Sequence, residues 1–350
     1  MTASSSDSSS VVTVLGAGSW GTALALHAAR EGLETRLWTR SAEHCAAMRA
    51  DRRNRRYLPD AEFGEHLTVT DDLDVALAGA DLVILAIPSH GMREAVVRVA
   101  AALARLEAQG RAIAPMYLIA AKGVEVDSLK TMADVLADEL PAIHHRRIAV
   151  LGGPSFAAEV AAGQPTAVVI ASAAREVAET IQCLLSGECL RVYVSDDVLG
   201  VELGGAFKNV IALAAGVCDG AGLGQNTRAA LITRGLAEIT RISLALGAHP
   251  ATLAGLAGLG DLVLTCTGGL SRNRRVGLAL GEGRKLAEIL QDMGMVAEGV
   301  KNTLSAQRLA AREGVEMPIT AMMHAILYED RSVQHAVAGL MRRDLKPERG

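Results

Sequence analysis

The stretch VVTVLGAGSWGTALALHAAR occupies residues 11–30 and decides the fold of the N-terminal half. Val11–Leu15 is an apolar, β-branched run that predicts a buried strand, and the Ala- and Leu-rich segment after it predicts a helix that stops at Glu31-Gly32. Between them, Gly16, Gly18 and Gly21 have the spacing G-x-G-x-x-G. The first glycine allows a tight turn, the second lets backbone amides approach a pyrophosphate, and the third lets helix and strand pack closely.

The alternative for this motif is an ordinary glycine-rich turn. Six further apolar runs follow, with helical segments between them, at residues 35–38, 82–86, 116–121, 148–151, 167–170 and 192–194. Such runs, alternating with helices, are typical of a parallel sheet covered on both faces. In that context we predict dinucleotide binding, with the helix start facing the phosphates.

The strand signal ends near Ser195, and Ala/Leu-rich stretches predict helices at residues 198–217, 227–246, 276–290, 298–313 and 319–328. Asn226 is the expected cap of the second helix and Gly247 its stop. The predicted fold class is an α/β N-terminal Rossmann-type domain with a mostly parallel sheet, followed by an all-α C-terminal domain. The predicted boundaries are a disordered lead-in at 1–10, a dinucleotide-binding domain at 11–195 and a helical substrate domain at 196–340.

Composition excludes several classes of protein. Of 350 residues, 50% are hydrophobic, 21% are charged and 3% are aromatic, which excludes a disordered chain and argues against base stacking. The net charge of −4 provides no basic field for nucleic acid or an anionic membrane. No uninterrupted apolar stretch reaches about 18 residues, so we expect no transmembrane span.

The cysteine pattern and the N-terminus predict a cytoplasmic protein. The five cysteines are an odd number and include no C-x-x-C pair, which suits a reducing compartment. The serine-rich first ten residues have neither the cationic start nor the apolar core of a secretory signal.

The end of the second predicted strand bears on which nicotinamide is preferred. It reads Trp38-Thr39-Arg40-Ser41, with no carboxylate to bind a ribose 2′-hydroxyl. Arg40 and Ser41 could accept a 2′-phosphate, so NADPH is expected to be tolerated and preferred; the alternative is that Arg40 is an ordinary solvated arginine. The basic run at residues 52–56 is predicted to be a solvated face or a flank of the adenine end rather than a DNA-binding arm. It is short, isolated in an acidic chain and followed by Tyr57-Leu58-Pro59, which is typical of a loop.

Polar residues gather where a substrate could meet the cofactor. Lys122-Gly123 and the segment GGPSFA at 152–157 follow two predicted strands, whose carboxyl ends share one edge of the sheet. Lys208 lies in the apolar segment LGGAFKNVIAL at 203–213. It either snorkels to the surface or lines a cleft with a pKa lowered by desolvation, as a general acid or base would.

Two more polar groups follow in the helical half. Asp261 comes after GLAGLG at 255–260 and is either a ligand contact or a helix N-cap. Ser271-Arg272-Asn273-Arg274-Arg275 precedes a predicted helix, where cations oppose the helix dipole unless an anion is bound, which predicts a site for a small phosphate. No His, Cys, Asp or Glu cluster has metal-ligand spacing, so no metal is expected.

Nine blocks occur in the order of a known family: GAGSWGTALA at 16–25, NRRYLP at 54–59, AIPS at 86–89, AKG at 121–123, GPSFA at 153–157, EL and KNV within 202–210, GLGDL at 258–262, SRNR at 271–274 and AEG at 297–299. Over residues 11–330 the chain therefore resembles bacterial NAD(P)-dependent glycerol-3-phosphate dehydrogenase. The serine-rich start and the tail after about Arg331 depart from that pattern.

The resemblance implies interconversion of dihydroxyacetone phosphate and sn-glycerol 3-phosphate with NADP(H) and/or NAD(H), supplying glycerol phosphate for phospholipid synthesis. Its implied cofactor contacts are Gly16, Gly18, Ser19, Trp20, Gly21, Arg40, Tyr57, Lys122, Ala157, Arg272, Val296 and Glu298. Its implied substrate contacts are Lys122, Gly153, Ser155, Lys208, Asp261, Ser271, Arg272 and Asn273. Lys208 would be the proton donor and acceptor, and Lys122 would stabilise the oxyanion. The oligomeric state stays open, a homodimer included.

Two alternatives remain. One is another two-domain reductase of the ketopantoate or β-hydroxyacid type, against which the cations at 272–275 favour a phosphorylated substrate. The other is a cofactor-sensing binding protein without turnover, which has no need of Lys208 in an apolar helix.

Overall fold

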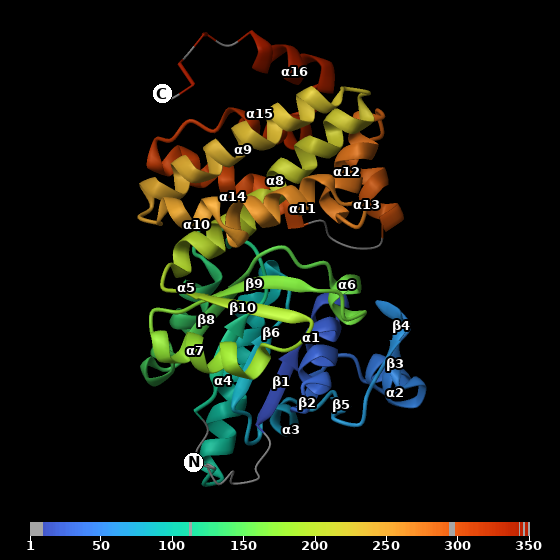
Figure 1. Ribbon diagram of the computed structural model, residues 1–350, viewed down its shortest axis with the longest axis vertical. Coiled ribbons are helices and arrows are strands. Elements are labelled where there is room, and N and C mark those ends of the chain that lie inside the picture. The colour runs from blue at the N-terminus through green and yellow to red at the C-terminus, as the bar shows by residue number, and fades with distance from the viewer. Residues whose placement is uncertain (1–9, 112–113, 294–297, 343, 346, 349–350) are drawn as a thin grey trace. The chain divides into compact units, whose positions relative to one another are not determined.

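An eight-stranded sheet forms the centre of the N-terminal part of the chain. The computed structural model describes residues 10–111, 114–293, 298–342, 344–345 and 347–348. The predicted lead-in therefore lies, except for Ser10, outside the described residues. Contacts divide the chain into a unit made of Met1–Lys122 and Met132–Val198, called here the sheet unit, and a unit made of Gly123–Thr131 and Leu199–Gly350, called the helical unit (Figure 1).

The strand order in the sheet is β10-β9-β8-β7-β6-β1-β2-β5. The bounds are β1 Val11–Leu15, β2 Glu34–Trp38, β5 Leu67–Thr70, β6 Leu82–Leu85, β7 Met116–Ile119, β8 Ile148–Gly152, β9 Thr166–Ala171 and β10 Leu190–Ser195. All neighbours pair in parallel except β8 and β9, which are antiparallel. The mostly parallel sheet is thus confirmed, and the order changes direction between β1 and β6, where such sheets bind ligands.

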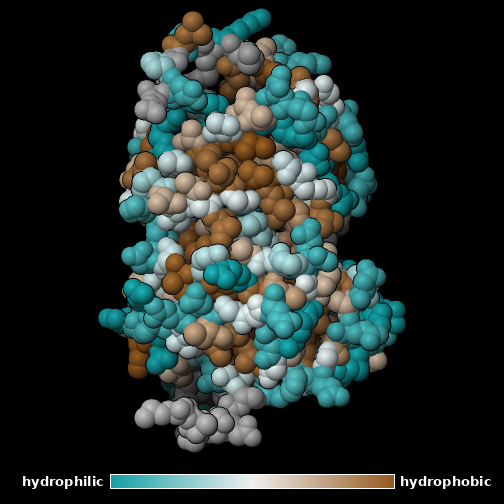
Figure 2. Space-filling model, in the orientation of Figure 1, coloured by the Kyte–Doolittle hydropathy of each residue, from teal (hydrophilic) through white to brown (hydrophobic). Residues whose placement is uncertain are grey.

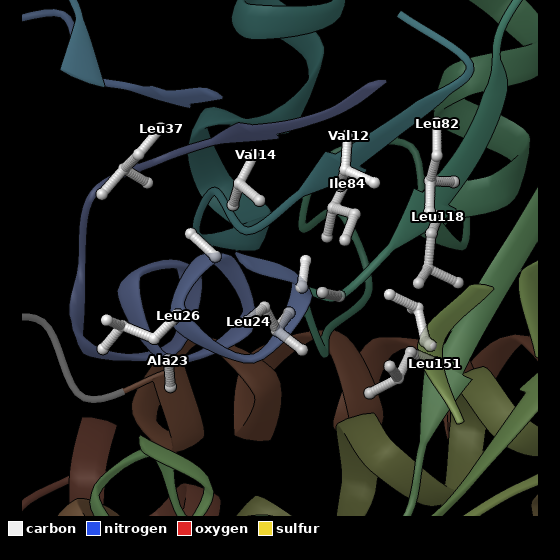
Figure 3. Close-up of a cluster of buried hydrophobic side chains, with 14 of the residues drawn as sticks. Val12, Val14, Ala23, Leu24, Leu26, Leu37, Leu82, Ile84, Leu118 and Leu151 are labelled. Atoms are coloured by element: carbon white, nitrogen blue, oxygen red, sulfur yellow. The ribbon is translucent and has the colours of Figure 1, made fainter. Parts of the chain in front are cut away.

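Helices cover this sheet because its central strands are apolar on both faces. In β6 all four residues are at most 1% exposed. The helices of the sheet unit are α1 Ser19–Arg30, α2 Ala42–Asp51, α3 Leu73–Leu77, α4 Met92–Ala108, α5 Met132–Glu139, α6 Ala157–Ala161 and α7 Arg175–Leu185, with 3-10 turns η1 Ser89–Gly91 and η2 Ala142–Arg147. Figure 3 shows side chains of α1 meeting those of the strands in the core, among them Leu24, Val14 and Ile84.

Tyr57-Leu58-Pro59 is not simply the loop that the sequence predicted, because Leu58 and Pro59 already belong to a strand. Arg53–Asn54 is β3, which pairs antiparallel with β4, Leu58–Glu62. The backbone N–H of Phe63 also donates to the Arg52 carbonyl, 2.8 Å away. The prediction failed because this hairpin is held by backbone bonds and has no apolar period. The short strand β5 was also missed, because its alternating Leu-Thr-Val-Thr is not the continuous apolar run by which the other strands were predicted.

The helical unit consists, from Leu199 on and within the described residues, of helices and their connections. They are α8 Val198–Gly220, α9 Gln225–Ala245, α10 Pro250–Ala254, the π-helical turn η3 Leu256–Gly260, α11 Asp261–Thr267, α12 Arg272–Gly281, α13 Leu286–Met293, α14 Glu298–Glu313, α15 Pro318–Tyr328 and α16 Val333–Met341. The all-α prediction is confirmed.

Two details of the helix prediction are wrong and one is confirmed, each for a local reason. The predicted helix at 276–290 is two helices, because the chain turns at Gly283, where φ is +91°. Asn226 is not a cap, since α9 already begins at Gln225, after Gly224. Gly247 does end α9, with φ of +97°.

Residues 123–131 follow β7 in the chain but belong to the helical unit, to which they are hydrogen-bonded. Val124 and Thr131 form an isolated antiparallel bridge. Ser305 Oγ of α14 donates to the Val124 carbonyl at 3.1 Å, and Arg308 Nη1 donates to the Val126 carbonyl at 3.1 Å. This segment, inside the stretch predicted to be dinucleotide-binding, thus has its partners on α14.

Helix α8 is the core of the helical unit. Among the described residues it is the one helix whose length and composition would allow it to cross a membrane, yet 89% of its most apolar window is buried. A helix in the core of a globular unit can be just as long and as apolar as a membrane span. The high burial of α8 is what is expected of such a core helix. On the face drawn in Figure 2, further apolar residues gather over the helical unit.

Helices α8 and α12 approach so closely that only glycine fits between them. A Cβ on Gly216 would lie 2.0 Å from the Arg274 carbonyl oxygen, and one on Gly277 would lie 2.0 Å from the Leu213 carbonyl oxygen. Gly220 and Gly281 are equally confined, one turn further along. This α8–α12 glycine contact fixes α12 along the C-terminal part of α8.

Glu238 of α9 caps the start of α15 from the side. Its carboxylate oxygens accept bonds from the N–H groups of Ile319, at 2.6 Å, and Thr320, at 3.2 Å. Burial nevertheless raises the pKa of Glu238 from 4.5 to about 7, because desolvation of the charge outweighs these bonds.

We therefore expect the stability contribution of Glu238 to fall as pH rises from 4.5 to 7, where the unfolded chain has lost this proton and the folded chain keeps it, and to stay level above. Glu238→Gln removes the titration. The free energy of unfolding of the wild type minus that of Glu238→Gln, from urea denaturation, should be larger at pH 5 than at pH 8, by on the order of 3 kcal/mol. A difference independent of pH would show that Glu238 ionises normally.

Candidate active site

In the G-x-G-x-x-G motif, called here the fingerprint, Gly16 and Gly21 are required by the fold, because a side chain at either position would collide with the backbone. Gly16 has φ of +113°, and a Cβ there would lie 2.6 Å from the Ala86 carbonyl oxygen. A Cβ on Gly21 would lie 1.9 Å from the Gly16 carbonyl oxygen. A Cβ on Gly18, by contrast, would meet no protein atom within 4 Å. The open space at Gly18 therefore fits a ligand that lies against the backbone, as a dinucleotide pyrophosphate does.

The start of α1 is open to an anion. Gly18 is its N-cap residue, and no side chain among the described residues caps it. Ser19 Oγ donates to the Tyr57 carbonyl at 3.2 Å, and Trp20 Nε1 donates to the Ala120 carbonyl at 3.1 Å, beside Lys122. The first turn of α1 is thus bonded to the 54–57 turn and to the end of β7, while no described side chain caps its first N–H groups.

Arg40 follows β2 as predicted. It is exposed and forms no hydrogen bond with any described residue, and no carboxylate lies beside it in Thr39-Arg40-Ser41. Ser41 Oγ accepts from the His44 N–H at 3.2 Å and caps α2, but its proton remains available to a phosphate.

The other arginines of this region are mostly used inside the sheet unit. Arg52 Nη2 donates to the carbonyls of Phe63 and Gly64, both at 2.9 Å. Arg53 pairs with Glu62, and Arg55 Nε lies 2.7 Å from Asp51 Oδ2. The Arg56 guanidinium lies 5.2 Å from the centre of the Tyr57 ring. These internal partners leave little of the positive charge at 52–56 available to a ligand.

Asn54 is a residue that sequence reasoning missed. It is fully buried, and its Nδ2 donates to the Ala17 carbonyl at 3.0 Å and to Thr22 Oγ1 at 2.8 Å. Its Oδ1 accepts from His44 Nε2 at 3.1 Å. The available signal was an amide among arginines, which the interpretation as a solvated run ignored.

The two strand-end loops do meet. Lys122 Nζ donates to the Gly153 carbonyl at 3.2 Å, and Ser155 Oγ donates to the same oxygen at 3.1 Å. Gly153 has φ of +111°, and a Cβ there would lie 3.1 Å from Val168 Cα. Ala157 is the first residue of α6. Four predicted residues are therefore brought together at the carboxyl ends of β7 and β8.

Lys208 does not snorkel to the surface. It is 7% exposed, and its Nζ donates to Asp261 Oδ1 at 2.5 Å and to Thr265 Oγ1 at 2.7 Å. The Thr265 hydroxyl proton goes to the Asp261 backbone carbonyl at 2.6 Å, so its lone pair receives Lys208. The carboxylate favours the ammonium form of the lysine, and the two bonds hold Nζ in a defined place.

Asp261 is not the helix N-cap of the alternative interpretation. It is the first residue of α11, after Gly260, and is 1% exposed. Thr265, one turn later on the same face, was missed; its spacing of four from Asp261 was the signal.

The thiol of Cys266, which lies near Lys208 and Asp261, is unreactive. Burial raises the pKa of Cys266 to about 12, which outweighs the opposing effect of Lys208. Cys266 therefore stays protonated at neutral pH and is no candidate nucleophile.

Two of the polar residues at the start of α12, Ser271 and Asn273, form hydrogen bonds within the protein that the sequence did not indicate. Ser271 Oγ caps the helix, accepting from the Arg274 N–H at 3.3 Å. Asn273 Nδ2 donates to Asn209 Oδ1 at 2.9 Å, and its Oδ1 accepts from the Gly299 N–H at 3.0 Å. Asn273 thus joins α8, α12 and α14. Asn209 is a further residue that sequence reasoning did not single out.

Only part of the predicted cationic cluster is free for an anion. Arg274 Nη2 lies 2.6 Å from Asp219 Oδ2, and Arg228 Nη1 lies 3.1 Å from Asp219 Oδ1. Arg272 and Arg275 are exposed and form no ion pair with the described residues. The charge that remains for a phosphate is therefore that of Arg272 and Arg275.

The structure says little about two of the predicted cofactor contacts, Val296 and Glu298. Val296 lies outside the described residues, and Glu298 is the first residue of α14. In the described part of the chain, no three His, Cys, Asp or Glu side chains gather as a metal site.

Comparisons with known proteins show the family of this chain. The models of the NAD-dependent glycerol-3-phosphate dehydrogenase N-terminus and C-terminus match residues 11–178 and 197–338. A glycerol-3-phosphate dehydrogenase (NAD(P)+) of Geobacter metallireducens is 54% identical over 339 residues, 97% of this chain and 99% of the relative. The crystal structure of glycerol-3-phosphate dehydrogenase from Coxiella burnetii has a TM-score of 0.89 at 42% identity, over 96% of this chain and 99% of that one. The Saccharomyces cerevisiae glycerol-3-phosphate dehydrogenase shares the fold, with a TM-score of 0.79 at 23% identity, over 96% and 100% of the two chains.

The buried pair Lys208–Asp261 makes a stability prediction. Asp261→Leu strands a buried ammonium and should destabilise the protein by about 3–5 kcal/mol. The double variant Lys208→Met/Asp261→Leu removes both charges and should recover most of that loss. Guanidinium unfolding of the wild type, both single variants and the double variant gives the coupling energy; additive effects would show that the two groups do not interact.

Proposed function

Because the chain belongs to the NAD-dependent glycerol-3-phosphate dehydrogenase family, we propose that it interconverts dihydroxyacetone phosphate and sn-glycerol 3-phosphate with NAD(P)H. The observation that carries this proposal is the Lys208 ammonium, buried against Asp261 and Thr265 and so placed to give up a proton. When bound, the reduced nicotinamide supplies the hydride.

In reduction, negative charge grows on the substrate carbonyl oxygen, and Lys208 donates the proton to it. In oxidation, the neutral Lys208 amine takes the proton from the secondary hydroxyl. Asp261 and Thr265 hold Nζ in one position in both directions, which lowers the entropic cost of the transfer. We propose that Asp261 binds the substrate as well.

In the sheet unit we propose that Lys122, Gly153 and Ser155 bind the substrate, with Lys122 stabilising the oxyanion. Gly16, Gly18, Ser19, Trp20 and Gly21 would hold the dinucleotide backbone, and the remaining proposed cofactor contacts are Arg40, Tyr57, Lys122, Ala157, Arg272, Val296 and Glu298. The exposed Arg40, without a neighbouring carboxylate, supports a preference for NADPH over NADH.

At the start of α12 we propose that Arg272 binds the substrate phosphate, assisted by Ser271 and Asn273. The cap and bridge bonds of Ser271 and Asn273 support the position of Arg272, which itself has no internal ion pair among the described residues. Binding energy from the phosphate would then orient the reacting carbon at a distance.

We further propose that the reaction supplies glycerol phosphate for phospholipid synthesis in the cytoplasm. All five cysteines lie among the described residues and none is bridged, which supports a reducing compartment. A ketopantoate-type reductase would need a site for a plain carboxylate, whereas the free arginine at the α12 start favours a phosphorylated substrate. A sensor without turnover leaves the buried ammonium without a role.

We expect Lys208→Met to keep NADPH binding and to lower kcat by roughly two to four decades, the scale of a lost general acid. NADPH oxidation with dihydroxyacetone phosphate measures kcat, and fluorescence titration measures cofactor binding. The matched control is Lys285→Met, an exposed lysine of the same unit. Full activity of Lys208→Met would leave the lysine a purely structural role.

Arg272→Ala should raise the KM for dihydroxyacetone phosphate by about tenfold to a hundredfold, as expected for a lost charge-assisted bond. At saturating NADPH, which offsets any weaker cofactor binding, it should leave the slow turnover of unphosphorylated dihydroxyacetone unchanged, since that substrate lacks the phosphate that Arg272 binds. Arg284→Ala, which breaks an exposed ion pair with Asp292, is the control. Equal effects on the two substrates would remove Arg272 from the phosphate site.

A further inference from the structure

We propose that Asn54 is a positioning residue for the cofactor: it turns the Ala17–Gly18 peptide so that the Gly18 N–H points at the dinucleotide phosphates. This inference rests on the proposed function, because it assumes that the fingerprint binds a dinucleotide. Asn54 would not touch the cofactor and would act through the loop that does.

The side chain of Asn54 is held in a single orientation. It is 0% exposed, and its Nδ2 donates to the Ala17 carbonyl at 3.0 Å and to Thr22 Oγ1 at 2.8 Å. A flipped amide would turn its oxygen toward the Ala17 oxygen. On the other side His44 Nε2 lies 3.1 Å from Asn54 Oδ1, so the bond requires the tautomer with the proton on Nε2.

The geometry of the peptide bond carries this orientation to Gly18. In a planar trans peptide the C=O of one residue and the N–H of the next point in opposite directions. Because the Ala17 carbonyl is bonded to the buried Asn54, the Gly18 N–H is turned to the other side. No described side chain caps this start of α1, and a Cβ on Gly18 would meet no protein atom within 4 Å, so a ligand has room beside this residue.

The other end of Gly18 is fixed by the same group of residues. The Gly18 carbonyl accepts from the Thr22 N–H at 2.9 Å, the first bond of α1, and the Thr22 hydroxyl accepts from Asn54. The turn that contains Asn54 is itself bonded to the fingerprint: Tyr57 N–H donates to the Asn54 carbonyl at 3.2 Å, and Ser19 Oγ donates to the Tyr57 carbonyl at 3.2 Å. Asn54 is thus the centre of a clamp on the phosphate-binding loop.

The test uses Asn54→Asp, which keeps the size of the side chain but replaces both N–H donors by an acceptor facing the Ala17 carbonyl. Both tryptophans of the chain, Trp20 and Trp38, lie in the sheet unit, at the start of α1 and at the end of β2, so quenching of their fluorescence reports cofactor binding. We expect the Kd values for NADPH and NADH to rise alike, by about tenfold, since both share the pyrophosphate. We expect kcat at saturating cofactor and the KM for dihydroxyacetone phosphate to stay within about twofold, because Asn54 does not touch the reacting atoms.

The matched control is Ser172→Ala. Ser172 is 1% exposed in the same unit, and its Oγ donates to the Ile148 carbonyl at 2.7 Å, away from the fingerprint. It should lower the melting temperature and leave both Kd values unchanged. If Asn54→Asp does not fold, the half-buried His44→Phe variant decides: it removes only the bond to Asn54 Oδ1 and should weaken both dinucleotides to a smaller, equal extent.

Unchanged Kd values in a folded Asn54→Asp variant, or in His44→Phe where it has to decide, would overturn the inference. So would weaker binding of NADPH alone, which would indicate the 2′-phosphate, or an equal loss in Ser172→Ala, which would indicate general destabilisation. Failure of the wild type to bind either dinucleotide would overturn the proposed function together with this inference, whereas wild-type binding with an unaffected variant overturns only the role of Asn54.

Discussion

Close approach of backbone to backbone is the constraint on which both units depend. In the sheet unit a Cβ on Gly21 would lie 1.9 Å from the Gly16 carbonyl oxygen, so the fingerprint loop and α1 can fold only around glycine. In the helical unit the α8–α12 glycine contact plays the same part, with Gly216 against Arg274 and Gly277 against Leu213. Each contact positions a helix at whose start we propose that a phosphate binds.

Buried polar side chains then hold what the glycines bring close. Lys208, Asn54 and Asn273 are each bonded at least twice to partners from other segments. A buried polar group is costly when unpaired and defines a single geometry when paired, so these bonds preorganise the site before any ligand arrives. The proposed proton donor Lys208, the loop that Asn54 holds and the start of α12 that Asn273 holds are all fixed in this way.

The balance of positive charge follows the same logic. Arg274 is paired with Asp219, and three of the four arginines at 52–56 have internal partners. Arg40 and Arg272 are exposed and unpaired with the described residues. Arg40 follows the end of β2 and Arg272 begins α12, the two places where we propose that a phosphate binds. Charge in a sequence therefore overstates the charge available to a ligand, because many cations are neutralised within the fold.

The sequence alone was sufficient for the strand–turn–helix with its three glycines, for the mostly parallel sheet, for the all-α second part and for Lys208 as an anomaly. These are local patterns: the period of apolar residues and a charge in an apolar segment need no knowledge of what lies nearby. The partners of the side chains were beyond it. That Asn54 reaches Ala17 across 37 residues, that Asp261 and Thr265 meet Lys208 across more than 50, and that Arg274 is neutralised by Asp219 are decided by tertiary packing. A hydrogen bond depends on distances between segments remote in the chain, and only the folded structure sets those distances.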